Sequence, residues 1–325
     1  MELALAPMEG VLDALLRKTL TALSPYDFAV TEFIRVSNTA LPARVFTRIA
    51  PELLNAGKTT AGVPVRIQLM GSDAQLLAQT AAIVVQLKSP GIDLNFGCPA
   101  KLINRNGGGA ILLDDPERLF EIVCAIRKNV PLTVPLTAKM RLGVKDKSRA
   151  IECAQALAQA GVTGLIVHAR TKEEGYRPPA HWTWVRLIHE AVSVPVIANG
   201  EIWTYEDYLR CCIESGVEDV MLGRGALADP FLVTRIRERR AETDRIAEWE
   251  QIKFELPRYW RDVCGKVAPH HAAGRFKQWL NFLRRTYPQA QKMFEILRPL
   301  QSISDFEMAL HTQGLILEAP KELGS

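Results

Sequence analysis

The sequence lacks long apolar runs, a leader-like start and any regular spacing of cysteines. No uninterrupted apolar stretch approaches the ~18 residues that a membrane-spanning helix needs. The first ten residues carry Glu2 and no basic cluster, so a secretory signal peptide is not expected. The six cysteines match neither a metal-ligand spacing nor a disulfide framework, which predicts reduced thiols, no metal site and a cytoplasmic protein.

The net charge of the chain is small, +4 at pH 7, but the charged residues are unevenly distributed. Residues 1–230 hold 24 basic and 24 acidic residues, whereas residues 251–300 hold 10 basic and 3 acidic ones. A neutral body with a basic C-terminal part indicates a polyanionic partner bound at one end. The alternative at this point is a solvated basic helix face with no partner.

Eight short β-rich runs recur along the first 223 residues and alternate with helical patterns. The runs cover residues 3–8, 28–33, 65–70, 91–96, 137–142, 164–169, 194–199 and 217–223. Helices are predicted between them, for example at 73–87, 115–128 and 149–160, because these stretches are rich in good helix formers. Eight β/α alternations predict a (β/α)8 TIM barrel. An open doubly wound sheet is not favoured, because no GxGxxG turn follows the first strand.

The strand pattern stops after residue 230, and four helices are predicted at 246–263, 272–287, 289–297 and 304–313. The sequence therefore predicts two domains: a barrel over residues 1–240 and a C-terminal helical bundle over residues 241–325. No low-complexity linker separates them.

Polar residues stand at the end of nearly every predicted strand. Active sites of (β/α)8 barrels lie at these carboxyl ends. Burying such polar side chains costs a few kcal/mol each unless they are satisfied, so packing alone does not explain them. We therefore predict a ligand site, against the alternative of a polar rim, with these residues in it: Pro7, Met8, Glu9, Arg35, Gln68, Asn95, Cys98, Lys139, His168, Asn199, Gly200, Glu201, Gly223 and Arg224.

The last two strand ends predict a phosphate site. Asn199 and Gly200 follow the seventh strand, and Gly223 and Arg224 follow the eighth. Glycine-rich backbone N–H groups beside a guanidinium, between strands seven and eight, are typical of phosphate binding in this fold.

Two further side chains narrow the ligand. Gln68 offers a donor and an acceptor, which suits the imide edge of a heterocycle. Lys139 offers a positive charge beside an anionic ring position. Together with the phosphate site they favour FMN, and a sugar phosphate or a nucleotide substrate remains open on these residues alone.

Cys98 stands between Gly97 and Pro99, just past the fourth predicted strand. This setting predicts a thiol exposed on a loop at the barrel mouth, where it can act as general acid or nucleophile. The inert alternative is a cysteine that packs as a small hydrophobe. A glycine-rich run at 101–110 follows, and we expect it to be mobile enough to close over a substrate.

These motifs together resemble the tRNA dihydrouridine synthase family along almost the whole chain. The matching segments are residues 6–10 (APMEG), 94–99 (LNFGCP), 139–143 (KMRLG), 168–171 (HART), 197–200 (IANG) and 223–225 (GRG). Shorter segments resemble the bacterial DusC type, which modifies position 16 of the D-loop: 31–36 (TEFIRV), 171–177 (TKEEGYR) and 275–280 (RFKQWL).

The resemblance implies bound FMN, NADPH as electron donor and a tRNA uridine as substrate. It also implies that the reduced flavin gives hydride to C6 of a flipped uracil, while Cys98 protonates C5 to give 5,6-dihydrouridine. The cofactor residues we predict are the strand-end residues listed above without Arg35, Asn95 and Cys98: Pro7, Met8, Glu9, Gln68, Lys139, His168, Asn199, Gly200, Glu201, Gly223 and Arg224. No membrane and no stable protein partner are implied.

Contacts to the tRNA are expected from both domains. In the barrel, Asn95 and Arg177 are candidates for the uracil edge, Tyr176 for stacking and Arg35 for a phosphate. In the helical domain, Phe276, Leu280 and Leu283 form an inward stripe. Arg275, Lys277 and Trp279 flank it and are candidates for phosphate and base contacts, with a buried Trp279 as the alternative.

Two other classes of function remain open on the residues. A flavin barrel acting on a small molecule, similar to dihydroorotate dehydrogenase, explains the cofactor residues but not the basic segment 251–300. A noncatalytic RNA-binding module explains the charge but not Cys98 beside an intact flavin constellation. Bound flavin argues against the second class, and RNA-dependent oxidation of reduced flavin argues against the first.

Overall fold

The computed structural model describes residues 1–100 and 107–315. Most of the glycine-rich run expected to close over a substrate, residues 101–106, lies outside the described residues. The chain divides into two compact units. The first holds Met1–Ala14 and Tyr26–Gly223, and the second holds Leu15–Pro25 and Arg224–Ser325. The sequence places the domain change after about residue 240, whereas the structure divides the chain after Gly223.

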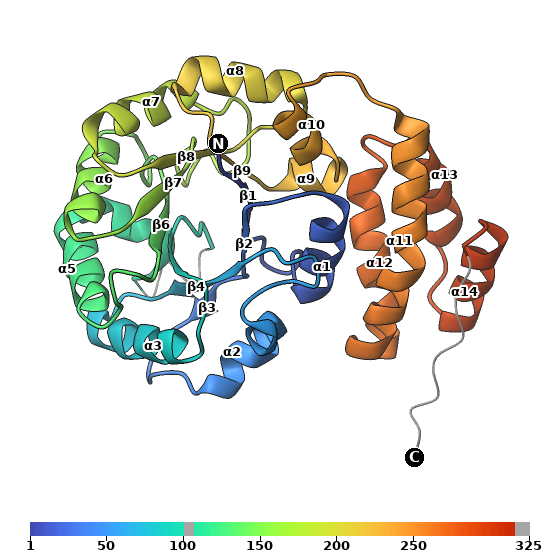
Figure 1. Cartoon of the computed structure of the whole chain (residues 1–325), viewed down its shortest axis with the longest axis horizontal. Helices are drawn as coiled ribbons and strands as arrows, with labels where there is room; N and C mark the ends of the chain where they lie inside the picture. The colour runs from blue at the N-terminus through green and yellow to red at the C-terminus, as the bar shows by residue number, and fades with distance from the viewer. Residues whose placement is uncertain (101–106, 316–325) are drawn as a thin grey trace. The chain divides into compact units, whose positions relative to one another are not determined.

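The first unit is a closed barrel of parallel strands (Figure 1). Within the described residues, eight strands pair in the ring β2-β1-β9-β8-β7-β6-β5-β4, and pairing of β2 with β4 closes it. The predicted (β/α)8 barrel is confirmed. The strands are β1 (Leu3–Leu5), β2 (Phe28–Val30), β4 (Val65–Met70), β5 (Ile92–Phe96), β6 (Leu136–Arg141), β7 (Gly164–His168), β8 (Val196–Asn199) and β9 (Val220–Leu222).

The run predicted at 28–33 forms a strand only at its start, as β2, and a second short strand follows just after the run; both pair with β4. β2 pairs Val30 with Arg66, and β3 (Ile34–Arg35) pairs Ile34 with Leu69. Between these two pairs, residues 31–33 stand opposite residues 67–68 of β4, which interrupts the ladder, and Arg35 pairs with Met70 at the end of β4.

Helices lie outside the strand ring (Figure 1). Several begin at sequence signals for a helix start: Asp73 caps α3 and accepts from the Leu76 N–H at 2.9 Å, and Asp115 caps α5 ahead of Pro116. Gly216 ends α8 at φ 73°, a conformation that glycine adopts without steric cost. The elements are α2 (Ala43–Ile49), η1 (Pro51–Asn55), α3 (Ala74–Gln86), η2 (Gly109–Asp114), α5 (Pro116–Arg127), α6 (Ala150–Gln159), α7 (Trp182–Ala191) and α8 (Tyr205–Ser215).

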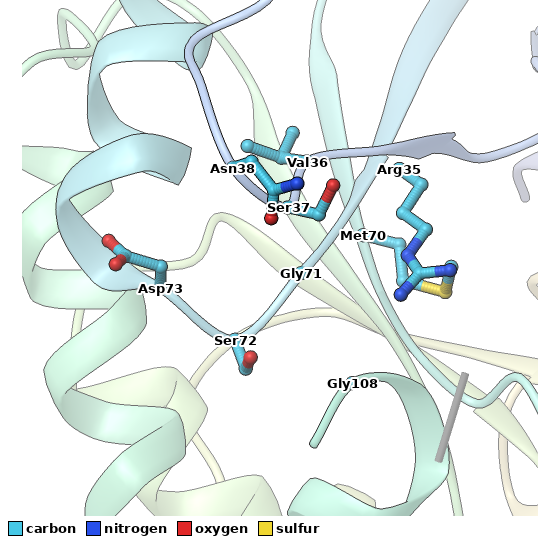
Figure 2. Close-up of a pocket in the computed structure, with 9 residues that line it drawn as sticks. All are labelled: Arg35, Val36, Ser37, Asn38, Met70, Gly71, Ser72, Asp73 and Gly108. Atoms are coloured by element: carbon cyan, nitrogen blue, oxygen red, sulfur yellow. The ribbon is translucent and has the colours of Figure 1, made fainter. Parts of the chain in front are cut away.

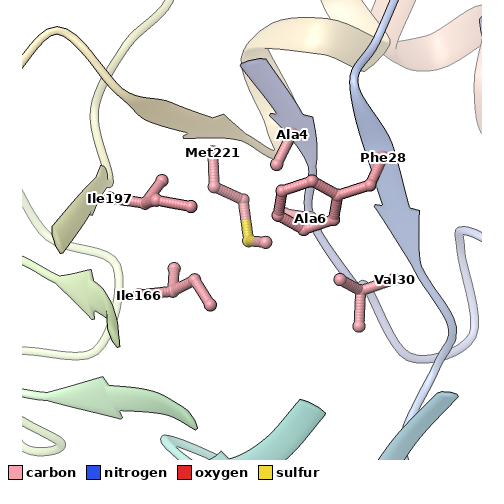
Figure 3. Close-up of a cluster of buried hydrophobic side chains, with 7 residues drawn as sticks. All are labelled: Ala4, Ala6, Phe28, Val30, Ile166, Ile197 and Met221. Carbon is pink, nitrogen blue, oxygen red and sulfur yellow. The ribbon is translucent and has the colours of Figure 1, made fainter. Parts of the chain in front are cut away.

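Apolar side chains fill part of the barrel interior. Figure 3 shows side chains from β2, β7, β8 and β9, and from β1 and the residue that follows it, pointing toward one another. Each is at most 4% exposed, which is the close packing that a barrel core requires. The cluster is Ala4, Ala6, Phe28, Val30, Ile166, Ile197 and Met221.

The second unit is helical, and aromatic side chains dominate its core. Trp260 lies 4.7 Å from Phe306 between ring centroids, and Tyr259 meets Trp279 edge-on at 5.2 Å. Arg235 forms buried ion pairs with Asp229 and Glu248, and the Tyr287 hydroxyl donates to Glu248 at 3.0 Å. Its helices are α1 (Ala14–Leu23), α9 (Arg224–Ala228), α10 (Leu232–Glu238), α11 (Arg245–Lys266), α12 (Pro269–Leu283), α13 (Pro288–Leu297) and α14 (Ile303–Thr312).

Among the described residues, none of the helices has both the length and the apolar character needed to cross a bilayer.

Candidate active site at the barrel mouth

The loop that carries Cys98 is fixed to the barrel by two side chains. The Asn95 Oδ1 accepts from the backbone N–H groups of Gly97 and Cys98, both at 2.9 Å. The Arg141 Nε donates to the Gly97 carbonyl at 2.8 Å. Asn95 lies on β5 and Arg141 on β6, so neighbouring strands hold the loop directly after β5.

Cys98 is buried, and the predicted exposure of its thiol is wrong. The residue is 8% exposed and packs in one cluster with Met70, while Phe33 and Ala100 lie against this pair. The sequence shows a Gly-Cys-Pro loop but not the hydrogen bonds of Asn95 and Arg141 that draw it onto the barrel. The position of Cys98 just past a strand end is as expected.

Burial also sets the protonation state of Cys98. It raises the pKa of the thiol, and the negative charge of Glu9 acts in the same direction, against the backbone N–H of Ala100 and Arg141. The thiol therefore keeps its proton at neutral pH. A group with this property is suited to donate a proton, and it is a poor thiolate nucleophile.

Lys139 and Asn199 meet across the barrel mouth. The Lys139 Nζ donates to the Asn199 Oδ1 at 2.9 Å, and the Asn199 Nδ2 donates to the Met221 carbonyl at 2.7 Å. Burial lowers the pKa of Lys139 to about 8, with Arg141 adding to the effect and Asp93 opposing it. An ammonium has three N–H groups, so Lys139 can donate to an anionic ligand besides Asn199.

Gln68 is fully buried, and both ends of its carboxamide are used within the barrel. Its Nε2 donates to the Asp93 Oδ2 at 2.7 Å, and its Oε1 accepts from the Asn95 Nδ2 at 2.8 Å. The contact to the imide edge of a ligand stays a prediction, and it would use the second N–H or the second lone pair of the amide.

Gly200 and His168 are packed so closely that glycine is required. Gly200 has φ 116°, and a Cβ there would lie 2.9 Å from the His168 Cδ2. Arg170, completely buried, pairs with the half-buried Glu201, whose other oxygen accepts from the Trp203 Nε1 at 3.0 Å. The four predicted residues from His168 to Glu201 thus form one side of the mouth.

Tyr176 and Arg177 lie on the loop after β7. The Tyr176 ring centroid is 5.9 Å from that of His168, and the Arg141 guanidinium lies 5.3 Å from the Tyr176 ring. Tyr176 is exposed, and Arg177 donates to the Glu173 carbonyl at 2.9 Å. The structure therefore brings Tyr176 beside His168, a predicted cofactor residue, while the contacts of Tyr176 and Arg177 to a uracil stay predictions.

The residues predicted after β1 and β9 are only partly brought together. A Cβ on Gly223 would lie 3.7 Å from the Met8 Sδ, so these two residues are neighbours, and Pro7 is half-buried beside Met8. Glu9 is exposed. Arg224 begins α9 in the helical unit, and its part in a phosphate site stays a prediction.

Arg35 borders a cavity of about 180 Å³ at the ends of β3 and β4 (Figure 2). Ser37, Asn38 and Ser72 contribute polar atoms to it, and Met70 lines it. Met70 also packs against Cys98, so the cavity adjoins the cluster that buries the thiol.

The three residues predicted to contact RNA in the helical unit are used within it. Trp279 is 1% exposed and packs against Tyr259, so its predicted role as a surface contact is wrong. The Lys277 Nζ donates to the carbonyls of Leu300 at 2.9 Å and Arg298 at 3.3 Å, just after α13. Arg275 is half-buried and donates to Gln278.

We expect Trp279→Ala to act on stability and not on RNA contacts. Truncating a buried tryptophan should lower the free energy of unfolding by about 3–5 kcal/mol. Urea unfolding monitored by circular dichroism measures this loss. A loss below about 1 kcal/mol, the level expected for an exposed side chain, would contradict the packed position.

Asp93 is not among the site residues that the sequence predicts, and Arg141 stands at a predicted strand end without an assigned role. Arg141 is 1% exposed and also donates to the carbonyls of Thr171 and Gly175, both at 2.9 Å. It therefore joins the Cys98 loop to the loop after β7. The sequence carries a signal for each, since a charged residue inside a strand of apolar residues has to be satisfied by specific partners.

Comparison with known proteins agrees with this geometry. A family model described as dihydrouridine synthase matches residues 4–303. A tRNA-dihydrouridine(16) synthase of Ralstonia nicotianae is 51% identical over 93% of both chains. One of Pseudomonas putida is 48% identical over 98% of this chain and 99% of its own, and one of Neisseria meningitidis serogroup A is 42% identical over 94% and 93%.

Solved structures support the fold. The old yellow enzyme from Trypanosoma cruzi has a TM-score of 0.53 at 10% identity, over 75% of this chain and 90% of that chain. Morphinone reductase in complex with tetrahydroNAD has a TM-score of 0.52 at 11% identity, over 75% and 88%. At these identities the likeness concerns the barrel alone. The family model and the sequence relatives go further, and by them this chain belongs to the dihydrouridine synthase family.

Proposed function

We propose that this protein reduces a uridine of tRNA, at position 16 in the D-loop, to 5,6-dihydrouridine, with FMN bound in the barrel and NADPH as electron donor. The observation that carries the proposal is the buried thiol of Cys98, whose loop Asn95 holds beside a mouth lined by Lys139, Asn199 and His168. The relatives named tRNA-dihydrouridine(16) synthase supply the substrate and the position.

The residues at the mouth fit a flavin mononucleotide by their chemistry. Lys139 would face the electron-rich end of the ring system, and Gln68 would face its imide edge. The backbone at Gly200 and Gly223 would hold a single phosphate. The close approach of Gly200 to His168 leaves no room for a Cβ on that side of the mouth. FMN, when bound and reduced, supplies a hydride.

Cys98 supplies the matching proton. Reduction of the C5–C6 double bond of uracil adds a hydride to C6 and a proton to C5. An acid must therefore stand within reach of C5. Asn95 and Arg141 fix the Cys98 backbone, and burial keeps the proton on sulfur until a base arrives. Because a paired uracil cannot reach such a site, the base has to be flipped out of the RNA.

Flavin content and its response to RNA test this assignment. The purified protein should carry FMN, be reduced by NADPH, and be reoxidised faster when unmodified tRNA is added under anaerobic conditions. FAD as the sole flavin would contradict the cofactor. Reoxidation by free orotate or another small acceptor, but not by tRNA, would favour the small-molecule oxidoreductase.

We propose further that the helical unit contributes to tRNA binding through its basic charge. Residues 251–300 carry ten basic and three acidic residues, and Arg258, Arg261, Lys266, Arg284 and Arg285 are exposed. RNA binding by such a surface releases counterions and weakens as salt rises.

Arg275→Glu is expected to weaken tRNA binding and to reduce the slope of log affinity against log salt by about 0.7–0.9 for each phosphate that the variant no longer neutralises. Lys128→Glu is the matched control, since Lys128 is exposed at the end of α5 and changes the net charge equally. Filter binding at several salt concentrations measures both. Equal effects of the two reversals would contradict a local contact, and flavin reduction by NADPH should be unchanged in both.

A further inference from the structure

A one-directional chain of hydrogen bonds runs from Asp93 to the backbone of Cys98. The Asp93 Oδ2 accepts from the Gln68 Nε2 at 2.7 Å. The Gln68 Oε1 accepts from the Asn95 Nδ2 at 2.8 Å, and the Asn95 Oδ1 accepts from the N–H groups of Gly97 and Cys98, both at 2.9 Å. The other oxygen of Asp93 accepts from the Thr137 hydroxyl at 2.6 Å.

The strands set this chain by their register. Gln68 on β4 pairs with Asp93 on β5, and Asp93 pairs with Thr137 on β6. Asp93 and Asn95 are two residues apart on β5 and therefore project to the same side of the strand. The side chains of Asp93, Gln68 and Asn95 thus project to the same face of the sheet, and Asn95 is the one that reaches the Cys98 loop.

The direction of the chain depends on the charge of Asp93. An ionised carboxylate accepts hydrogen bonds and donates none, whereas each carboxamide has one end of each kind. Asp93 therefore turns the NH2 group of Gln68 toward itself, which turns the Gln68 oxygen toward Asn95. The Asn95 NH2 group must face that oxygen, and the Asn95 oxygen is left to hold the two backbone N–H groups.

Apart from this role, the buried carboxylate of Asp93 lowers the stability of the fold. It is completely buried, and its hydrogen-bond donors Gln68 and Thr137 are neutral. Burial raises the pKa of the Asp93 carboxyl to about 6, and the hydrogen bonds from Thr137 and Gln68 oppose this, as do the charges of Lys139 and Arg66. An apolar residue would avoid the desolvation cost.

We propose that Asp93 is a positioning residue that acts through Gln68 and Asn95: its carboxylate fixes the orientation of both amides and so holds Cys98 where its proton can reach the substrate. The proposal rests on the role of Cys98 in the proposed function. It also concerns Gln68 directly, because the orientation of this amide decides which of its groups can meet a cofactor.

A charge swap between Asp93 and Asn95 tests the direction of the chain. In Asn95→Asp alone, Gln68 stands between two carboxylates and can donate to only one, so the chain is broken. In Asp93→Asn combined with Asn95→Asp, the new asparagine can donate to the Gln68 oxygen, Gln68 donates to the new aspartate, and that aspartate still accepts from Gly97 and Cys98. The double variant should therefore recover part of what the single variant loses.

We expect Asn95→Asp to lower kcat with tRNA by about 10²-fold, the cost typical of a small misplacement of a reacting group. The double variant should be at least about tenfold faster than this single variant, which is an interaction between coupled residues and not a sum of two losses. KM for tRNA should change far less than kcat, because most of the expected RNA contacts lie outside this chain of hydrogen bonds. Asp115→Asn is the control for the Asp93→Asn change of the double variant, because it makes the same substitution at the exposed cap of α5.

A second readout does not use turnover. The rate at which iodoacetamide alkylates Cys98, followed by peptide mass spectrometry, should change in Asn95→Asp and return toward the wild-type rate in the double variant. A double variant no better than Asn95→Asp in both kcat and alkylation would overturn the proposal. Recovery of alkylation with full activity of Cys98→Ala would instead uphold the chain and refute the proposed catalytic role of Cys98.

Discussion

Cys98→Ala is expected to lower dihydrouridine formation by about 10²–10⁴-fold, the usual contribution of a positioned general acid. The physical reason is that the raised pKa of the buried thiol keeps a proton beside the site where the base is reduced. The variant should still bind flavin and be reduced by NADPH at the wild-type rate, since neither step uses the thiol. Rapid-mixing absorbance for flavin reduction and mass spectrometry of digested tRNA measure the two steps separately.

Two variants serve as references for this result. Cys153→Ala removes a buried thiol from α6, which donates to the Leu113 carbonyl at 3.2 Å and lies outside the mouth. It controls for the loss of a buried sulfur. Cys98→Ser keeps an O–H group at the same position but with a much weaker acid. Normal dihydrouridine formation by Cys98→Ala would remove this residue from the mechanism.

Lys139→Met is expected to slow flavin reduction by about 10²-fold, because it removes the positive charge from a site where negative charge develops. Methionine keeps most of the side-chain volume, so the barrel should fold. The Asn199 amide loses its hydrogen bond to Nζ, which should also weaken flavin binding. Stopped-flow reduction at saturating FMN and fluorescence titration of FMN separate the rate from the affinity.

Lys128→Met, at an exposed lysine that ends α5, is the control for Lys139→Met. It changes the net charge equally and should leave both flavin binding and reduction unchanged. If Lys139→Met binds FMN and is reduced like the wild type, Lys139 is not a cofactor residue and the fit of the mouth to FMN fails.

The strand and helix pattern can be read from the sequence because local signals agree with the fold. The run at 65–70 forms β4 at the same bounds, and the helix predicted at 115–128 is α5 at Pro116–Arg127. Prediction is less exact at the first strand, which ends at Leu5 and not at residue 8. Pro7 lacks an N–H group for a strand ladder, which fits an early end.

The errors in the site have a common physical cause, which is packing from elements distant in sequence. The sequence places Trp279 beside the apolar stripe of α12, but α12 packs against α9, α11, α13 and α14, so its buried face is wider than one stripe. It places Cys98 on an exposed loop, but Arg141 and Asn95 hold that loop against the barrel. Neither set of contacts is visible in a local pattern.

The hydrogen-bond partners of Asp93 are likewise not predictable from the local sequence. Its strand, Ile92–Phe96, reads as a buried strand with one carboxylate in it, and the sequence does not say which partners satisfy the charge. Only the register of β4, β5 and β6 brings Gln68 and Thr137 to its two oxygens. The types of residue in the site can thus be predicted, but not the hydrogen bonds that orient them.

The most direct test of the proposed function is to map dihydrouridine in a single unmodified tRNA treated with the purified protein, FMN and NADPH. We predict one dihydrouridine, at position 16 of the D-loop, and at least about 10²-fold less of it when Cys98→Ala replaces the wild type at equal time and concentration. Modification at another position would contradict the assignment to position 16 and leave the chemistry intact. No dihydrouridine at any position from flavin-loaded, NADPH-reducible protein would contradict the proposed function itself.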